Sequence, residues 1–210
     1  MIKCGIGLGP FRRLEYNGGW NRQAAGQRPD PRGGHGAETW AGGAVTPKSQ
    51  PGRLSNVNTE NTRRRIRKFR DTDEADVVGV WYRAGMAAYT YLPTWQVLTL
   101  EQARWVFVNI IRPKCKIWVG TLDEQIIAYL AMNGSYIDRL YVDPLEWRKG
   151  WGTRFVNLAK QVSPQGIELH THVENLAARA LYERHGFKAV KFGTSPPPES
   201  APDVEYHWRP

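Results

Sequence analysis

Long hydrophobic runs are absent from this chain of 210 residues. No apolar stretch approaches the roughly 20 residues that a membrane-spanning helix needs, and Met1 is not followed by the pattern of a signal peptide. Cysteine is also scarce, since Cys4 and Cys115 are the only two. One lies in a glycine-rich tail and the other in an expected strand, which predicts reduced thiols rather than a disulfide. We therefore expect a cytoplasmic protein without membrane-spanning segments.

Acidic residues are outnumbered, with 20 Asp and Glu against 29 Lys and Arg and a formal net charge of +9. The densest basic run extends from Thr62 to Arg70, and such a run can bind nucleic-acid phosphates without sequence specificity. Ile66 and Phe69 within it instead favour entry into a first strand whose arginines lie on the solvated face. No recognition-helix pattern or RNA-binding aromatic signature accompanies the run. We therefore expect no specific nucleic-acid partner.

Residues 1–62 differ in composition from the rest of the chain. They contain many glycines, several prolines and scattered arginines, with few apolar residues at any regular period. Such a segment cannot bury enough apolar surface to offset the entropy lost on ordering. The composition predicts a disordered extension over residues 1–62, followed by one domain over residues 63–210.

Hydrophobic periodicity becomes regular beyond residue 63. Asp71 or Thr72 can cap a first helix, and the run from Thr99 to Gln102 is typical of a capping box that starts a second. Strands are expected at residues 116–120, 125–130, 137–142 and 167–171, and further helices at 151–162 and 176–185. Closing strands follow. This order of elements predicts an α/β sandwich.

A glycine loop follows the expected strand 137–142. The segment from Trp147 to Thr153 contains Gly150 and Gly152 and leads into a helix with one apolar face. The apolar residues of that face are Trp151, Phe155, Leu158, Ala159 and Val162. Glycines let the backbone approach a bulky anion, and the free amides at a helix start carry partial positive charge. Alone, the loop is equally typical of an ordinary strand-to-helix turn, and it is neither a P-loop nor a three-glycine dinucleotide fingerprint.

The segment after the strand 167–171 adds a second pattern. Asn175 is a good N-cap for the helix 176–185, and Gly186 suits its C-terminal end. The buried face is expected to consist of Leu176, Ala177, Ala180 and Leu181. This arrangement predicts that Tyr182 lies on a different side of the helix and faces a cleft.

These patterns together resemble the acetyl-CoA site of the GNAT superfamily of N-acetyltransferases. They are Leu140-Tyr141-Val142, the basic Gly-x-Gly loop, and Asn175-x-x-Ala178-x-x-x-Tyr182-x-x-x-Gly186-Phe187. The resemblance extends from about Ile66 to Trp208 and implies a mixed, mostly antiparallel central sheet flanked by helices. It implies direct acetyl transfer from acetyl-CoA to a primary amine within a ternary complex. Two alternatives are an enzyme for another acyl-CoA and a noncatalytic acyl-CoA-binding sensor on the same fold.

The resemblance also implies roles for individual cofactor residues. Backbone groups of Leu140, Tyr141 and Val142 would bind the pantetheine arm. The loop residues Trp147, Arg148, Lys149, Gly150, Trp151, Gly152 and Thr153 would take the pyrophosphate. Asn175 and Ala178 belong to the same site, although Asn175 could serve only as a helix cap. Trp147 departs from the Gln or Arg usual in the family, and Arg148 or Lys149 could supply the missing side-chain contact.

Tyr182 matches the tyrosine that the family places near the thioester sulfur, which makes it our candidate general acid. The alternative is a tyrosine that packs its ring and has a satisfied hydroxyl. Asp138 lies two residues before Leu140, so its carboxylate could attract an ammonium group or accept its proton, or could simply pair with Arg139. The two histidines at 170 and 172 share one face of a strand, but no further ligand stands at a recognisable spacing, and we expect no metal.

Tyr89, Tyr91 and Trp95 form an aromatic loop between the first two helices. The resemblance implies acceptor selection in this region, where aromatic walls can hold an amine by cation–π contact. The alternative is a hydrophobic clasp over the sheet edge. Exposed aromatics and edge strands are compatible with a homodimer. Because family members commonly begin just before the first strand, the natural start could also lie near Leu54 or Val57 rather than at residue 1.

Overall fold

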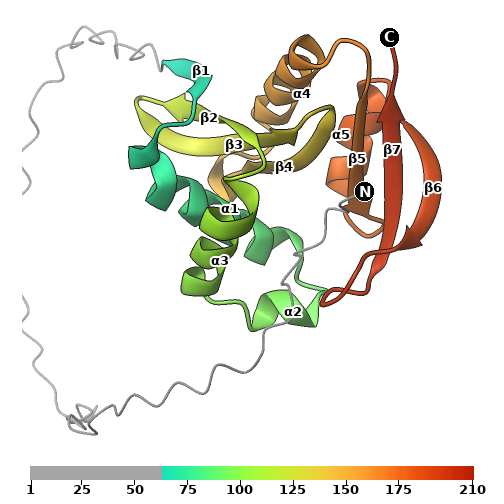
Figure 1. The fold of residues 1–210 in the computed structure, drawn as a ribbon, viewed down its shortest axis with the longest axis horizontal. Coiled ribbons are helices and arrows are strands. Elements are labelled where there is room, and N and C mark those ends of the chain that lie inside the picture. Colours follow the sequence, from blue (N-terminus) through green and yellow to red (C-terminus); the bar gives the residue numbers. More distant parts are fainter. Residues whose placement is uncertain (1–62) are drawn as a thin grey trace, which may run out of the picture. The chain divides into compact units, whose positions relative to one another are not determined.

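A seven-stranded sheet forms the centre of the computed structural model, which describes residues 63–210 (Figure 1). Its strands are β1 (Arg64–Lys68), β2 (Lys116–Leu122), β3 (Gln125–Asn133), β4 (Tyr136–Val142), β5 (Ile167–His172), β6 (Lys188–Thr194) and β7 (Pro202–Trp208). The spatial order is β1-β2-β3-β4-β5-β7-β6, and every neighbouring pair is antiparallel except β4 and β5. The expected mixed, mostly antiparallel sheet is confirmed. The expected extension over residues 1–62, Cys4 and the alternative starts lie outside the described residues.

Helices cover both faces of this sheet. They are α1 (Glu74–Ala88), α2 (Pro93–Gln96), α3 (Leu100–Val106), α4 (Trp151–Val162) and α5 (Leu176–Arg184). Two short 3-10 helices, η1 (Asp71–Asp73) and η3 (Pro144–Glu146), and a π-helical segment that continues α3, η2 (Phe107–Ile111), complete the set. Figure 1 shows α1 and α3 on one side and α4 and α5 on the other. None of the helices within residues 63–210 is both long and apolar enough to cross a bilayer.

The central strand β3 explains why both faces are covered. Its residues alternate between two hydrophobic cores: Tyr129 and Ala131 belong to the core under α1 and α3, whereas Leu130 and Met132 belong to the core under α4. Successive side chains of a strand point to opposite faces, so a nearly unbroken apolar run is buried only when both faces are packed. Seven consecutive residues of β3 are accordingly buried.

Two of the three predicted helix caps are confirmed. The prediction that Asp71 or Thr72 caps the first helix is wrong, because both lie within η1 and α1 begins at Glu74 after its N-cap Asp73. Thr99 and Gln102 form the expected capping box, with reciprocal side-chain to backbone bonds of 3.2 and 2.9 Å. Asn175 caps α5 by accepting a hydrogen bond from the backbone N–H of Ala178 at 3.1 Å. These local bonds satisfy amides that have no partner within the helix. Both helices therefore start at the residues that the local sequence selects.

The buried face predicted for α5 is wrong. Leu176 is 67% exposed, and Ala177 and Ala180 are exposed as well. The helix instead packs through Tyr182, which is only 7% exposed, with Leu181 beside it. The physical reason is that the apolar residues of the first turn line a cleft rather than the core. In α4 the predicted face is correct at Trp151, Phe155 and Ala159, but Val162 is exposed and Val156 replaces it in the core.

The strands β4 and β5 diverge after a single pairing. Tyr136 pairs with Glu168, and no further register pair connects the two strands. A bulge accompanies the divergence, because Ile137 pairs with Met132 and Arg139 with Ala131, which leaves Asp138 without a register partner on β3. Bulges bend a strand and redirect a side chain. From this point the edge of β4 that faces β5 is open toward a cleft.

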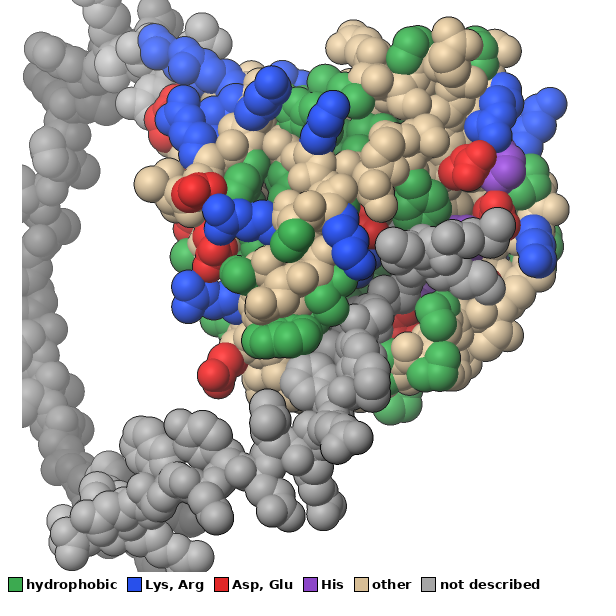
Figure 2. Space-filling view, in the orientation of Figure 1, with side chains coloured by type: hydrophobic (Ala, Val, Ile, Leu, Met, Phe, Trp, Pro, Cys, Tyr) green, Lys and Arg blue, Asp and Glu red, His purple; other side chains and the backbone are tan. Residues whose placement is uncertain are grey.

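The basic run becomes β1, as the apolar residues within it predict. Arg67 forms a bidentate ion pair with Asp73, with distances of 2.6 and 2.9 Å. This hydrogen-bonded guanidinium lowers the pKa of Asp73 below its ordinary value. Arg65 pairs with Glu124 at 3.5 Å. Figure 2 shows Lys and Arg interspersed with Asp and Glu on the face in view, so part of the positive charge of the run is neutralised locally.

Candidate active site

A cleft of about 670 Å³ opens where β4 leaves β5. Its walls come from the end of β4, the loop before α4, the start of α5 and the C-terminal end of α1. The lining residues predicted from the sequence are Tyr89, Leu140, Tyr141, Val142, Trp147, Arg148, Gly150, Trp151, Gly152, Thr153, Asn175, Ala178 and Tyr182. The fold thus brings the strand end, the glycine loop and the Asn175 helix to one cleft, although they are separated along the chain.

The loop before α4 is shaped by left-handed backbone. Gly150 is the N-cap of α4 with a φ of 87°, and Arg148 has a φ of 62°. A glycine adopts this conformation without strain, whereas a residue with Cβ does so rarely. Because the 12-residue helix starts at Trp151, its first amides open toward the cleft. This is a cradle for an anion.

Two ion pairs hold the loop before α4 in place. Asp143 accepts a hydrogen bond from the N–H of Leu145 at 3.1 Å and pairs with Arg83 of α1 at 2.7 Å. Glu146 pairs with Lys149 at 2.9 Å. Among the predicted loop residues, Lys149 is the one that does not line the cleft. The loop is therefore tied to α1 and to its own first turn.

Trp147 occupies the position where the sequence departs from the resemblance. Its ring is 41% exposed at the mouth of the cleft. Its indole N–H donates to the carbonyl of Val142 at 2.7 Å, which is short for such a bond. The side chain thus connects the loop to the last residue of β4. A donor is present at this position, although it is directed at the protein's own backbone.

Gly152 sets how closely α4 approaches α5. A Cβ built on it would lie 2.8 Å from Cδ2 of Leu181, which is closer than such contacts allow. Any larger residue therefore requires the Leu181 side chain to move. The cleft is therefore lined by glycine backbone and by the first residues of a helix, which are the features of a phosphate site.

A second cavity of about 70 Å³ lies beside the large cleft, between β4 and the end of β5. It shares six lining residues with the large cleft: Tyr89, Leu140, Tyr141, Asn175, Ala178 and Tyr182. Asp138 belongs only to this second cavity. Tyr182 lines both and packs against Phe187 and Tyr206, with ring centroids 5.5 and 6.2 Å away. The candidate acid and the candidate base therefore line the same small cavity.

Asp138 is held by its neighbour. Its carboxylate lies 3.0 Å from the guanidinium of Arg139, and both side chains are largely buried, at 14% and 7% exposed. Arg139 in turn lies over the ring of Trp81 at 5.8 Å. The ion pair that the sequence offered as the alternative for Asp138 is thus present, and the carboxylate still lines the second cavity.

The three residues predicted to bind the acceptor differ in whether they line a cavity. Tyr89 lines both cavities, Tyr91 stands beside it at 6.2 Å, and Trp95 is fully buried and lines neither. Trp95 packs edge-to-face on Trp81 at 6.2 Å, as the hydrophobic clasp predicts. Burial raises the pKa of the phenols of Tyr91 and Tyr141 above their ordinary value. These phenols are neutral hydrogen-bonding groups at physiological pH.

Sequence reasoning missed a buried pair at the far wall of the second cavity. Nε2 of His172, at the end of β5, lies 3.1 Å from Oε2 of Glu199, and the side chains are 6% and 3% exposed. Glu199 comes from the proline-rich loop before β7 and also accepts a hydrogen bond from the indole N–H of Trp95 at 3.3 Å. The sequence gives only a weak indication of this pair, namely a charged residue within a proline-rich loop.

The fold and the cleft define a site for an extended ligand that carries phosphates, with room for a second reactant beside its far end. The chain belongs to the acetyltransferase (GNAT) family, whose model matches residues 80–187, just over half of its length. As a member it is an acyltransferase that uses acetyl-CoA as the acetyl donor. The residues that line the large cleft fit such a ligand.

Among known proteins, the chain is similar to two named peptidyl-lysine N-acetyltransferase YjaB. The protein of Salmonella typhimurium strain LT2 is 25% identical over 126 residues, covering 60% of this chain and 83% of that protein. The protein of Escherichia coli K12 is 28% identical over 126 residues, covering 60% and 82%.

Two solved structures share the fold. Apo YjaB from Escherichia coli superposes with a TM-score of 0.59 at 20% identity, covering 69% of this chain and 97% of that one. The yncA protein from Salmonella typhimurium, solved with its cofactor acetyl-CoA, has a TM-score of 0.52 at 12% identity and covers 70% and 93%.

Proposed function

We propose that the protein transfers the acetyl group of acetyl-CoA directly to a primary amine within a ternary complex. The observation that carries this proposal is the junction of the two cavities at Tyr182 and Leu140. A donor in the large cleft and an amine in the small cavity would meet there. Holding two reactants in good geometry contributes roughly 7–11 kcal/mol to catalysis, so positioning is the main task of such a site.

The cofactor contacts follow from the shape of the cleft. The open edge of β4 at Leu140, Tyr141 and Val142 offers backbone groups to an extended amide chain, in the manner of an added strand. The amides at the start of α4 offer donors to the pyrophosphate. Asn175 caps α5, and in addition it lines both cavities, which supports a contact with the pantetheine arm.

Tyr182 is proposed as the acid that protonates the departing thiolate, because it lines both cavities and is buried among aromatic rings. Asp138 is proposed to attract the ammonium form of the acceptor. Its carboxylate lines the small cavity while remaining paired with Arg139. Neither role needs a covalent enzyme intermediate, which agrees with direct transfer.

For the acceptor we propose the side-chain amine of a lysine in a peptide or protein. Two similar proteins are named peptidyl-lysine N-acetyltransferase. In this chain, Tyr89 and Asp138 give the small cavity an aromatic wall and a carboxylate, which suit an alkyl ammonium group. The sensor alternative is not favoured, because these relatives are enzymes by name. A homodimer and a cytoplasmic location stay predictions from the sequence.

Calorimetric titration with acetyl-CoA, followed by turnover on a capped lysine peptide, tests this function. We expect saturable binding by the wild-type protein and loss of affinity by at least about a hundredfold in Gly152→Glu, since an added carboxylate beside the phosphates costs several kcal/mol. Gly134→Asp is the control for the added charge, because nothing lies within 4 Å of this hairpin turn and Asp is among the residues that most readily adopt its φ of 61°. The proposal would be wrong if acetyl-CoA did not bind the wild-type protein, or if both variants bound it equally well.

A further inference from the structure

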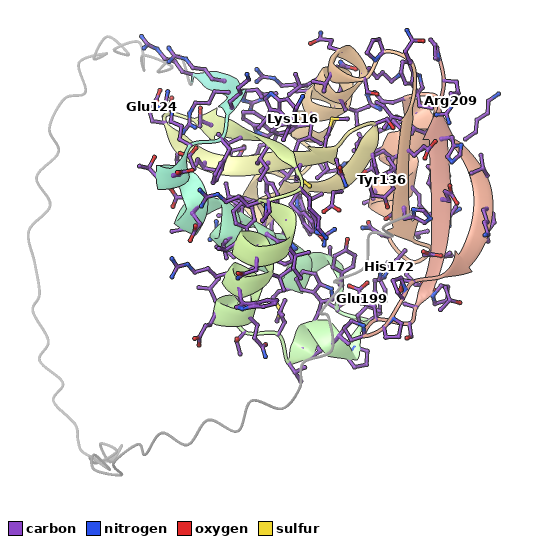
Figure 3. The ribbon with its side chains drawn as sticks, viewed as in Figure 1. Lys116, Glu124, Tyr136, His172, Glu199 and Arg209 are labelled. Atoms are coloured by element: carbon purple, nitrogen blue, oxygen red, sulfur yellow. The ribbon has the colours of Figure 1, made fainter. Side chains whose placement is uncertain are left out.

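The buried pair of His172 and Glu199 has no part in the roles assigned so far. In Figure 3, His172 at the end of β5 and Glu199 on the loop before β7 lie side by side. Their side chains are 6% and 3% exposed, and Nε2 lies 3.1 Å from Oε2. Burying a carboxylate is costly unless it is paired and hydrogen-bonded. Glu199 is held from two sides, by His172 and by the indole of Trp95.

The other ring nitrogen of His172 is the unusual feature. Nδ1 is buried and has no hydrogen-bond partner among residues 63–210. A buried polar atom without a partner costs about 1–3 kcal/mol, and each such atom in a folded protein calls for an explanation. His172 also lines the small cavity. A ligand in that cavity would lie against His172, and we consider it as the source of the missing partner.

The neighbouring histidine on the same face of β5 provides a contrast. Nδ1 of His170 lies 3.0 Å from the hydroxyl of Tyr136, and its Nε2 lies 3.6 Å from a carboxylate oxygen of Glu205. Both nitrogens of His170 therefore face protein groups. In His172 the carboxylate of Glu199 favours a proton on Nε2, and this tautomer leaves the lone pair on Nδ1.

The charged and titratable groups around His172 come from every element packed on it. The groups on its own sheet are Asp138, Arg139 and His170 on β4 and β5, and Asp203, its register partner on β7. The groups from the helices and loops are Tyr89, Tyr91, Tyr182 and Glu199. Among these groups, three carboxylates and one guanidinium carry charge.

Resting on the proposed amine acetylation, we propose that His172 is the base that takes the proton of the attacking amine on Nδ1, and that Glu199 holds the opposite nitrogen. The bound ammonium group first releases one proton to solvent through His172. The neutral amine nitrogen then bonds to the thioester carbonyl carbon, and the carbon–sulfur bond breaks. The thiolate receives its proton from Tyr182, and the surplus proton of the amine passes to His172. Over one turnover the proton gained by His172 balances the one lost by Tyr182, and solvent exchange resets both groups.

The test compares His172→Gln and Glu199→Gln with the wild-type protein on a capped lysine peptide. kcat and KM are measured at saturating acetyl-CoA from about pH 6 to about pH 10, and the Kd of acetyl-CoA is measured by calorimetry. His207→Gln is the control, since this histidine lies on β7, pairs with Glu205 at 2.8 Å and lines neither cavity.

We expect kcat of His172→Gln to fall by at least about a hundredfold with an unchanged Kd for acetyl-CoA. Its rate should climb steadily as the pH approaches the lysine pKa of about 10.4, because solvent then removes the proton in advance. Glu199→Gln keeps the hydrogen bond but removes the charge that stabilises the imidazolium, so the acidic limb of kcat/KM should move to lower pH. This isosteric variant keeps the proposal testable if His172→Gln does not fold.

The outcomes separate the two proposals. Wild-type turnover together with an unaltered rate and pH profile in His172→Gln, or an unmoved acidic limb in Glu199→Gln, overturns the role of His172 alone. Binding of acetyl-CoA by the wild-type protein without turnover on the lysine peptide overturns the proposed function and this inference with it. An effect of equal size in His207→Gln shows a general response to the loss of an imidazole and also overturns the inference.

Discussion

The two halves of the site are built in different ways. The cofactor half, residues 140–153 with the start of α5, consists largely of consecutive backbone and two glycines. The acceptor half, the end of β5 with the loops around Tyr91 and Glu199, consists of side chains from distant segments. Trp95 and Glu199, which bond to each other there, are 104 residues apart in the sequence. A site made of local backbone can be found from a short sequence pattern, whereas one made of distant side chains needs the fold.

The halves also differ in charge. The large cleft is lined by helix-start amides, Arg148 and Arg184, with Glu146 and Glu174 beside them. The small cavity is lined by the carboxylates of Asp138 and Glu199, with Arg139 paired to the first. One suits an anion and the other a cation. A substitution confined to one half should therefore alter the affinity for one reactant and leave the other unchanged.

The largest effect is expected where the halves meet. Tyr182→Phe removes the hydroxyl but keeps the ring that packs against Phe187 and Tyr206. Loss of a general acid lowers the rate by about 10²–10⁴-fold, so we expect kcat to fall by that amount while the Kd of acetyl-CoA is unchanged. Steady-state kinetics with calorimetry checks both. Full turnover by this variant removes the acid role and leaves Tyr182 as a packing residue.

An intermediate effect confined to the acceptor half is expected from Gly85→Ala. The new Cβ would lie 1.9 Å from the ring of Trp95, which packs on Tyr89 at a centroid distance of 5.1 Å. Overpacking of a core costs about 1–3 kcal/mol, and we expect KM for the peptide to rise about tenfold and Tm to fall.

Gly79→Ala on the same helix is the control for a small substitution in α1, since its Cβ would meet only the guanidinium of Arg83 at 3.0 Å, on the nitrogen that does not bond Asp143. The Kd of acetyl-CoA should be unchanged in both variants. A weaker affinity for acetyl-CoA in Gly85→Ala would show that the two halves are not independent.

The smallest effect is expected in the cofactor half at Trp147. Trp147→Phe removes the indole bond to the carbonyl of Val142 but keeps a ring at the cleft mouth. A hydrogen bond contributes about 0.5–1.5 kcal/mol net, so acetyl-CoA should bind about two- to tenfold more weakly. Trp147→Gln restores a donor and should bind more tightly than Trp147→Phe, as calorimetry can determine. The reverse order would mean that the ring itself contacts the cofactor.

Most of the fold was predictable because its signals are local. Thr99 and Asn175 cap their helices through bonds within three residues, and the glycines at 150 and 152 shape one turn. The bulge that leaves Asp138 unpaired was not predictable, because it depends on the register of a partner strand. The exposed side of α5 was missed for a related reason: apolar residues such as Leu176 line a cleft, and periodicity alone does not distinguish a cleft from a core.

The single pairing between β4 and β5 divides the sheet into a meander of four strands and a second group of three strands. Backbone hydrogen bonds join the two groups at one point only, so the ladder is broken in the middle of the molecule. In the proposed complex the extended arm of acetyl-CoA takes the place of the absent ladder. The donor would then act as a structural bridge as well as a reactant. Bound acetyl-CoA would then stabilise both groups of strands against local unfolding. The rate of their amide hydrogen exchange would therefore fall as the concentration of acetyl-CoA rises.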